Sequence, residues 1–92
     1  MLILVSYDVP DDRRRTRLAH ALKDFGERVQ RSVFECRLTA KQLEGLRGRV
    51  QALILPEEDS LRIYALCREC QGRLESLGTG KIVLEDPDSY VL

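Results

Sequence analysis

The chain opens with Met1-Leu-Ile-Leu-Val-Ser-Tyr-Asp8, an apolar run that ends in a polar triplet and is followed by Pro10. Its length and the Pro-Asp-Asp breaker behind it predict a buried strand rather than a helix. Side chains alternate across a strand, so Tyr7 shares one face with Ile3, and Asp8 lies on the opposite face. If helices cover the first face, the Asp8 carboxylate faces solvent or a partner on the other side of the sheet.

The composition indicates one small soluble domain that spans residues 1–92. Of these 92 residues, 43% are hydrophobic and 33% are charged, and a chain of this length rarely holds two cores. The apolar start is too short for a membrane span and lacks a basic leader, so we expect a cytoplasmic protein without membrane contact. A domain of this size buries only about 60 to 65% of its unfolded surface, which makes oligomerisation unsurprising.

Residues 10–53 show two helical patterns with a strand pattern between them. Residues 10–26 have helical spacing, with Asp11 or Asp12 as the cap and Gly26 as the stop. The apolar face of residues 28–38 switches near residues 32–34, which predicts a β-bulge or a break into two strands. The stretch Thr39-Ala-Lys-Gln42 matches a capping box and starts a second helix that ends by about residue 52.

The last part of the chain adds strands to this pattern. Residues 60–67 alternate as a strand, and residues 74–77 and 81–84 are short strand candidates. We expect residues 81–92 to pair with a sheet edge of the same subunit or of a partner. The order of elements predicts an α+β, ferredoxin-like βαββαβ plait with an extra C-terminal strand and both helices on one face. A symmetric homodimer would cover the bare face of such a sheet.

Positive charge gathers in the first half of the chain, although the net charge is zero. Residues 1–52 hold eleven Lys or Arg against seven acids, and residues 53–92 hold four against eight. The start of the first predicted helix carries Arg13, Arg14, Arg15 and Arg17, where the helix dipole disfavours cations. A helix start with several guanidiniums suits a phosphate group. The alternative is a solvated face whose arginines pair with Asp11, Asp12 and Asp24.

The three cysteines do not predict a disulfide framework, because their number is odd and the chain shows no export signal. Cys67 and Cys70 have the two-residue gap of a zinc or redox pair, but there is no second pair, and the only histidine is His20. We therefore expect Cys67 and Cys70 to be small, partly buried residues at a strand end.

Three motifs stand out in the first seventy or so residues. They are Ser6-Tyr-Asp-Val-Pro-Asp-Asp-Arg-Arg-Arg15, Phe25-Gly-Glu-Arg-Val-Gln-Arg-Ser-Val-Phe-Glu35 and, more weakly, Asp59-Ser-Leu-Arg-Ile-Tyr64. In this order they resemble the small CRISPR-associated adaptation proteins, a family of endoribonucleases that partner the larger adaptation integrase. Members of that family are described as metal-dependent nucleases on single-stranded RNA or double-stranded DNA, and also as non-catalytic scaffolds for duplex DNA during spacer acquisition.

The resemblance implies a ferredoxin-like homodimer in which the strand-end aspartates of two subunits face each other and share a magnesium ion. Asp8 is the residue carried over for that role. The family positions that matter for cleavage correspond here to Asp8, Tyr7, Arg15, Arg17, Arg28 and Phe34. On strand parity and general grounds, Tyr7 and Phe34 also suit the core, His20 suits a solvated helix face, and Asp8 could simply cap the chain near Pro10.

Two functions compete on these grounds. The first is a Mg²⁺-dependent phosphodiesterase, because one or two carboxylates plus substrate phosphate are sufficient ligands for this ion. The second is a scaffold that holds duplex DNA by its phosphates without base readout. In both, the expected nucleic-acid-binding residues are Arg13, Arg14, Arg15, Arg17, Arg28 and Arg31. A small-molecule regulatory module of similar fold is a third reading, which would leave these arginines without a role.

Overall fold

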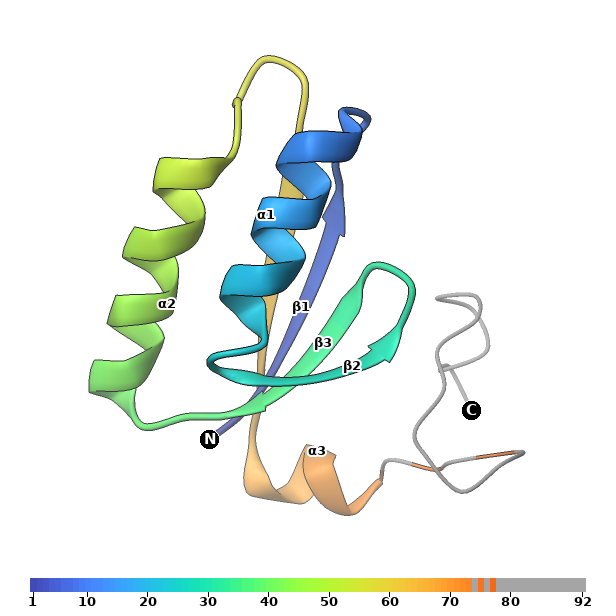
Figure 1. Ribbon diagram of the computed structural model, residues 1–92. Helices are drawn as coiled ribbons and strands as arrows, with labels where there is room; N and C mark the ends of the chain where they lie inside the picture. The colour runs from blue at the N-terminus through green and yellow to red at the C-terminus, as the bar shows by residue number, and fades with distance from the viewer. Residues whose placement is uncertain (74, 76, 78–92) are drawn as a thin grey trace.

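The computed structural model describes residues 1–73, 75 and 77, and it forms a four-stranded antiparallel sheet with two helices on one face (Figure 1). The elements in chain order are β1 (Leu2–Asp8), α1 (Asp12–Leu22), β2 (Gly26–Gln30), β3 (Val33–Arg37), α2 (Ala40–Leu53), β4 (Ser60–Leu66) and α3 (Arg68–Gly72). The strand order β2-β3-β1-β4 makes β1 an interior strand. The predicted α+β, ferredoxin-like plan is confirmed. The strands predicted at 81–84 and at the C-terminus lie outside the described residues, as does part of 74–77.

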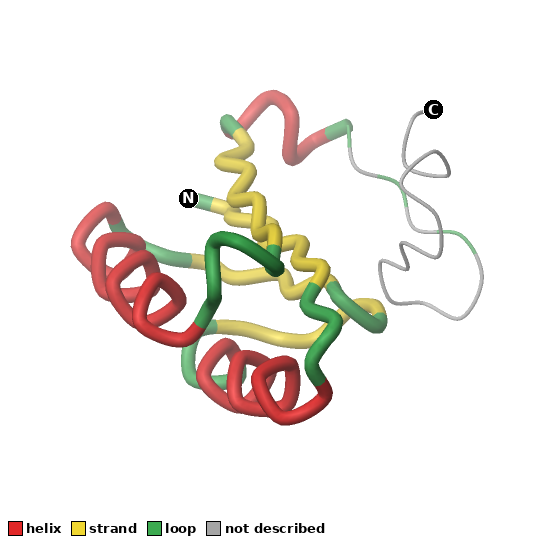
Figure 2. Tube along the Cα trace, turned by 90° about the horizontal axis from the view of Figure 1, so that it is seen from above, coloured by secondary structure: helices red, strands yellow, loops and turns green. Residues whose placement is uncertain are grey.

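The core fills the space between the sheet and the two long helices, which lie on the same side of it (Figure 2). Ile3, Val5 and Tyr7 face this core from β1, as the alternation predicts. The helices contribute apolar residues at helical spacing, and β3 contributes the side chains of alternate positions. The helix and β3 residues of the core include Leu18, Leu22, Phe34, Cys36, Leu43, Leu46 and Val50.

The helix-free face of the sheet is only partly bare. Leu2 and Leu4 are buried, so the expectation of a wholly uncovered face is wrong for this end of β1. The short helix α3 explains the burial of Leu2. Gln71 of α3 donates from Nε2 to the Leu66 carbonyl at 3.1 Å, and its Oε1 accepts from Arg37 Nη1 at 3.5 Å. Leu66 and Arg37 are the residues that flank Leu2 in the sheet register. The face stays open toward the other end of β1.

The first helix is shorter than its pattern predicts. Asp11 is its N-cap and accepts from the Arg14 backbone N–H at 2.8 Å, so one of the two predicted caps is confirmed. The helix ends at Leu22, and Gly26 begins β2 instead of stopping the helix. A Cβ at Gly26 would collide with the Glu35 carbonyl oxygen across the β2–β3 ladder. The glycine therefore serves the close approach of two strands.

The segment from residue 28 to 38 divides as predicted. A turn at residues 31–32 separates β2 from β3, and the register shifts between Arg28 and Gln30. The predicted capping box of α2 is present, with Thr39 Oγ1 accepting from the Gln42 N–H at 3.2 Å. Within the described residues no helix has the length and apolar character to cross a membrane.

The cysteine pair lies in a different setting from the one expected. Cys67 caps α3, a five-residue helix that the sequence does not predict, and both Cys67 and Cys70 are exposed. The expectation of partly buried residues is therefore wrong, because the chain turns into α3 at Cys67 and leaves the sheet. Cys36, in contrast, is fully buried in β3.

Candidate nucleic-acid interface

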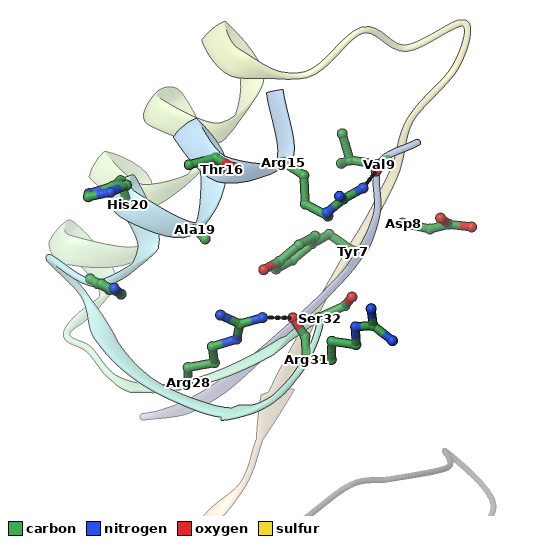
Figure 3. Close-up of a pocket in the computed structure, with 11 residues that line it drawn as sticks. Tyr7, Asp8, Val9, Arg15, Thr16, Ala19, His20, Arg28, Arg31 and Ser32 are labelled. Carbon is green, nitrogen blue, oxygen red and sulfur yellow. Dashed lines mark hydrogen bonds between the residues drawn. The ribbon is translucent and has the colours of Figure 1, made fainter. Parts of the chain in front are cut away.

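Tyr7 and Asp8 diverge at the end of β1. Figure 3 shows the Tyr7 ring pointing toward α1 and β2, whereas the Asp8 carboxylate points to the opposite side of the strand. Tyr7 is only 4% exposed and stacks on Phe34, with ring centroids 6.3 Å apart and an interplanar angle of 29°. Asp8 is exposed and pairs with Ser60 of β4 in the sheet register. The predicted separation of these neighbours onto two faces is confirmed.

A polar cavity of about 500 Å³ lies beside Tyr7, between α1 and the β2–β3 hairpin (Figure 3). We call it the hairpin cavity. Four cationic residues line it: Arg15 of α1, Lys23 at the C-terminal end of α1, and Arg28 and Arg31 of the hairpin. His20 of α1 lies beside them. The remaining lining residues are Tyr7, Asp8, Val9, Thr16, Ala19 and Ser32.

Backbone carbonyls hold two of the cavity's guanidiniums in place. Arg28 Nη2 donates to the Arg31 carbonyl at 2.7 Å, and its Nε lies 3.4 Å from the Gln30 carbonyl. Arg15 Nη1 donates to the Val9 carbonyl at 2.9 Å, and Arg15 also forms an ion pair with Asp12 at the helix start. These bonds orient the two arginines before any ligand arrives.

The Tyr7 hydroxyl is the unusual group of the cavity. It is buried and has no hydrogen-bond partner among the described residues. Burial raises the pKa of the Tyr7 phenol above its ordinary value, although the positive charges of Arg28 and Arg15 act in the opposite direction. The phenol therefore stays protonated at neutral pH and can donate a hydrogen bond.

Arg14 lies away from the hairpin cavity, in an ion pair at the start of α1. Its Nε and Nη2 donate to the two carboxylate oxygens of Asp59 at 2.8 and 2.9 Å, and Nη2 also reaches Glu58 at 3.0 Å. The Asp59 side chain is 0% exposed and that of Arg14 is 17% exposed. The pair holds the pKa of Asp59 below its ordinary value. The predicted contact of Arg14 with nucleic acid stays a prediction, and it would require this pair to open.

Arg13 and Arg17 occupy the outer side of α1, where both are exposed. With Asp12 and Thr16 they line a shallow depression of about 470 Å³. Among the hydrogen bonds and ion pairs of the described residues, neither guanidinium has a partner. The predicted cluster therefore divides into an internal pair at Arg14, the cavity residue Arg15 and two outward-facing arginines.

Phe34 is a core residue with 0% exposure, beneath Tyr7 and between the helices and the sheet. The structure thus supports the core reading of its side chain. Its predicted part in cleavage stays a prediction, and the buried ring would act there through its stacking contact with Tyr7.

The end of β1 offers a magnesium ion one carboxylate per chain, that of Asp8. No three acidic, histidine or cysteine side chains gather as potential metal ligands in the described part of the chain. Asp8 is exposed on the helix-free face, where a second copy of the chain could bring its own Asp8 alongside. Because Mg²⁺ needs only one or two carboxylates beside water and substrate phosphate, the donor set fits an ion shared between two chains.

His20 and Lys23 are cavity residues that the sequence reading did not select. His20 is exposed, as expected, but it also lines the hairpin cavity. Thr16, His20 and Lys23 follow each other at spacings of four and three, and residues at that spacing share one helix face. This periodicity was visible in the sequence, whereas the hairpin that completes the cavity was not.

Comparison with known proteins agrees with this architecture. The chain is 52% identical over 89 residues to a CRISPR-associated endoribonuclease Cas2 of Thermus thermophilus, in an alignment that covers 96% of this chain and 95% of the relative. The crystal structure of Streptococcus pyogenes Cas2 at pH 6.5 is 37% identical and superposes with a TM-score of 0.74, covering 85% of this chain and 100% of that one. A chain of a partial Cas6-RT-Cas1–Cas2 complex is 29% identical, with a TM-score of 0.65 and coverage of 83% and 89%.

The family comparison covers most of the described residues. The family model for the CRISPR-associated protein Cas2 matches residues 1–74, which include β1, both long helices and the whole hairpin cavity. With the full-length relative at 52% identity, this match shows that the chain belongs to the CRISPR-associated Cas2 family.

Proposed function

We propose that the protein acts in CRISPR adaptation as a homodimeric phosphodiesterase that cleaves RNA or double-stranded DNA with a magnesium ion held between two Asp8 carboxylates. The observation that carries this proposal is the position of Asp8, exposed on the helix-free face at the end of an interior strand. The Thermus relative is named an endoribonuclease, which supports nuclease activity. The complex that contains Cas1 and Cas2 supports the larger adaptation integrase as the partner.

The chain's own residues have separate tasks in this proposal. Asp8 provides one carboxylate ligand, and the second copy provides the other. When bound, the ion would polarise the phosphodiester and lower the pKa of a coordinated water. Arg28 and Arg31 are exposed on the hairpin and neutralise phosphate charge near this end of the sheet, which favours a pentavalent transition state with extra negative charge.

The helix-free face supplies the surface for the dimer. Tyr64 is 45% exposed on that face, next to Leu4 in the register, and β4 is an edge strand in the described sheet. An exposed aromatic residue on an uncovered sheet face is suited to contact with a second copy. Tyr64→Glu should therefore shift the molar mass measured by light scattering from dimer to monomer.

The test of the enzyme proposal compares Asp8→Asn with Glu44→Gln. Glu44 is an exposed carboxylate on α2, so its variant controls for the loss of one charge. Asp8→Asn should reduce cleavage of single-stranded RNA and of duplex DNA by about a hundredfold or more if it removes the metal ligand, since loss of a group that only supports a ligand already costs about 10- to 100-fold. Glu44→Gln should cleave at the parental rate. Equal rates for all three proteins would show that a contaminating nuclease cleaves the substrate.

A scaffold for duplex DNA is the second candidate, and the outward-facing pair Arg13 and Arg17 favours it. Exposed, unpaired arginines can contact a phosphate backbone without any catalytic group. In this case Asp8→Asn should bind duplex DNA as tightly as the parent. The double variant Arg13→Ala and Arg17→Ala should weaken binding and reduce the slope of log K against log salt by about two units. An unchanged slope would remove these two arginines from the DNA contact.

A further inference from the structure

The hairpin cavity carries positive charge beyond the Arg28 and Arg31 guanidiniums that the Asp8 chemistry would use. Four cationic side chains line it, and Asp8 is the single acidic lining residue, with its carboxylate directed to the other side of β1 (Figure 3). A concave site with one sign of charge focuses its field on a counter-ion. The chemistry of the lining therefore selects an anion.

The inner end of the cavity holds a polar group that lacks a partner. The Tyr7 hydroxyl is buried and unpaired among the described residues, while the residue as a whole is 4% exposed. Figure 3 shows the hydroxyl directed into the space between α1 and Arg28. Buried hydroxyls usually have a hydrogen-bond partner, so an orphaned phenol in a cationic cavity indicates a missing acceptor.

Arg28 is prepared to bind such an acceptor. A guanidinium has five N–H donors, and the bonds from Nε and Nη2 to the Gln30 and Arg31 carbonyls leave others free. Because these bonds already fix the side chain, little conformational entropy remains to be lost when a ligand binds. Arg15 is held in the same way by the Val9 carbonyl.

We propose that the hairpin cavity is a binding site for a phosphate monoester, formed by the Tyr7 hydroxyl together with Arg15 and Arg28. The cavity, at about 500 Å³, falls in the range of small-ligand sites. A group that reaches the buried hydroxyl at the inner end must terminate there, which favours a terminal phosphate over an internal diester with chain on both sides. A monoester also carries about 1.5 to 2 negative charges at neutral pH, which matches several cations better than the single charge of a diester.

This site shares Arg28 with the proposed nuclease, but its occupation does not depend on cleavage. It requires neither a metal ion nor a second copy of the chain, and it lies on the opposite side of β1 from the Asp8 carboxylate. The monoester could be the 5′-phosphate of a nucleic-acid strand or free phosphate. The two sources share the same chemistry and are separated by the choice of probe.

Isothermal titration calorimetry of the full chain in EDTA tests the proposal. The probes are a 5′-phosphorylated tetranucleotide, the same tetranucleotide with a 5′-hydroxyl, and inorganic phosphate. The phosphorylated strand should bind at least tenfold more tightly than the unphosphorylated one. Equal or tighter binding of inorganic phosphate would identify free phosphate as the source, and weaker binding would identify a strand end. Equal binding of both tetranucleotides, without binding of inorganic phosphate, would overturn the proposal.

Two variants assign the binding to the cavity. Tyr7→Phe keeps the ring that stacks on Phe34 and removes only the hydroxyl, and Arg28→Ala removes an exposed guanidinium. Each should weaken binding of the phosphorylated probe by about tenfold or more, the usual size of one hydrogen bond to a charged group. Arg47→Ala removes the same charge from an exposed position on α2 and should change affinity less than twofold. If Arg28→Ala and Arg47→Ala behave alike, or if Tyr7→Phe binds normally, the cavity is not the site.

Discussion

Replacement of Phe34 by leucine separates a structural role of this residue from a direct role in nucleic-acid chemistry. Phe34 is 0% exposed and its ring stacks on Tyr7. Truncation of a buried phenylalanine to alanine costs about 3 to 5 kcal/mol, a large share of the roughly 5 to 15 kcal/mol that typically stabilises a domain. Leucine keeps most of the volume and loses the aromatic pair, so we expect a cost of about 2 kcal/mol.

That cost has a measurable thermal consequence. For a domain of fewer than about 100 residues, 1 kcal/mol shifts Tm by about 4 to 8 °C, so Phe34→Leu should lower Tm by about 8 to 16 °C. The matched control is Phe25→Leu, because Phe25 is only partly buried and its ring lies 5.7 Å from the Arg49 guanidinium. Its Tm should fall by less than half as much.

The assay combines melting curves by circular dichroism with nucleic-acid binding well below the Tm of each variant. If Phe34 has only a core role, the affinity of folded Phe34→Leu for single-stranded RNA and duplex DNA should be within about threefold of the parental affinity. The reason is that Tyr7, which stacks on Phe34, would shift slightly but keep its place. The reasoning would be refuted by an unchanged Tm together with a tenfold loss of binding or cleavage. That combination would mean that the ring reaches the substrate, and therefore that the core opens.

Two further predictions concern titratable groups. Asp59→Asn should lower Tm at neutral pH much more than Glu58→Gln, because the Asp59 carboxylate is fully buried against Arg14 and that of Glu58 is 59% exposed. The pKa of folded Asp59 is depressed, so its stabilisation is present above its unfolded pKa of about 3.9 and lost as pH falls through the lower folded value. Asp59→Asn should therefore flatten the acid decline of Tm, and a parallel decline in both variants would contradict this assignment. Iodoacetamide near neutral pH should modify Cys67 long before Cys36, because burial raises the pKa of Cys36 to about 11 and the Cys70 backbone N–H lowers the pKa of Cys67. Peptide mass spectrometry would detect the order, and equal rates would show that the Cys36 site is open to solvent.

Local patterns were sufficient to predict the fold. The alternation in β1 placed Tyr7 toward the core and Asp8 on the other face, because side-chain direction in a strand depends only on parity. The capping box at Thr39 predicted the start of α2 for an equally local reason, since it needs two side chains three residues apart. The end of α1 was predicted too late because Phe25 continues the apolar spacing after the helix has ended at Leu22.

The candidate site was less accessible to sequence reasoning, because it depends on contacts between distant residues. Arg14 looked like a phosphate ligand by its place at a helix start, yet its carboxylate partner Asp59 is 45 residues away. The five-residue α3 is too short to show a period, so the cysteines at its start were assigned to a strand end. The hairpin cavity forms because the β2–β3 turn lies opposite α1. The spacing of residues along the chain does not show that these two elements come together.

The Arg14 ion pair also affects the hairpin cavity, although Arg14 does not line it. The pair joins the first turn of α1 to the loop before β4, and β4 is bonded along its length to β1. The ion pair therefore also anchors the helical turn that carries Arg15, which lines the hairpin cavity together with Tyr7. A shift of the pairing register by one residue would move every side chain of β1 to the other face of the sheet. The pairing with β4 therefore keeps Tyr7 and Asp8 on opposite faces. If the proposed phosphate site is occupied, Arg14 would therefore contribute to it by positioning Arg15, without contacting the phosphate itself.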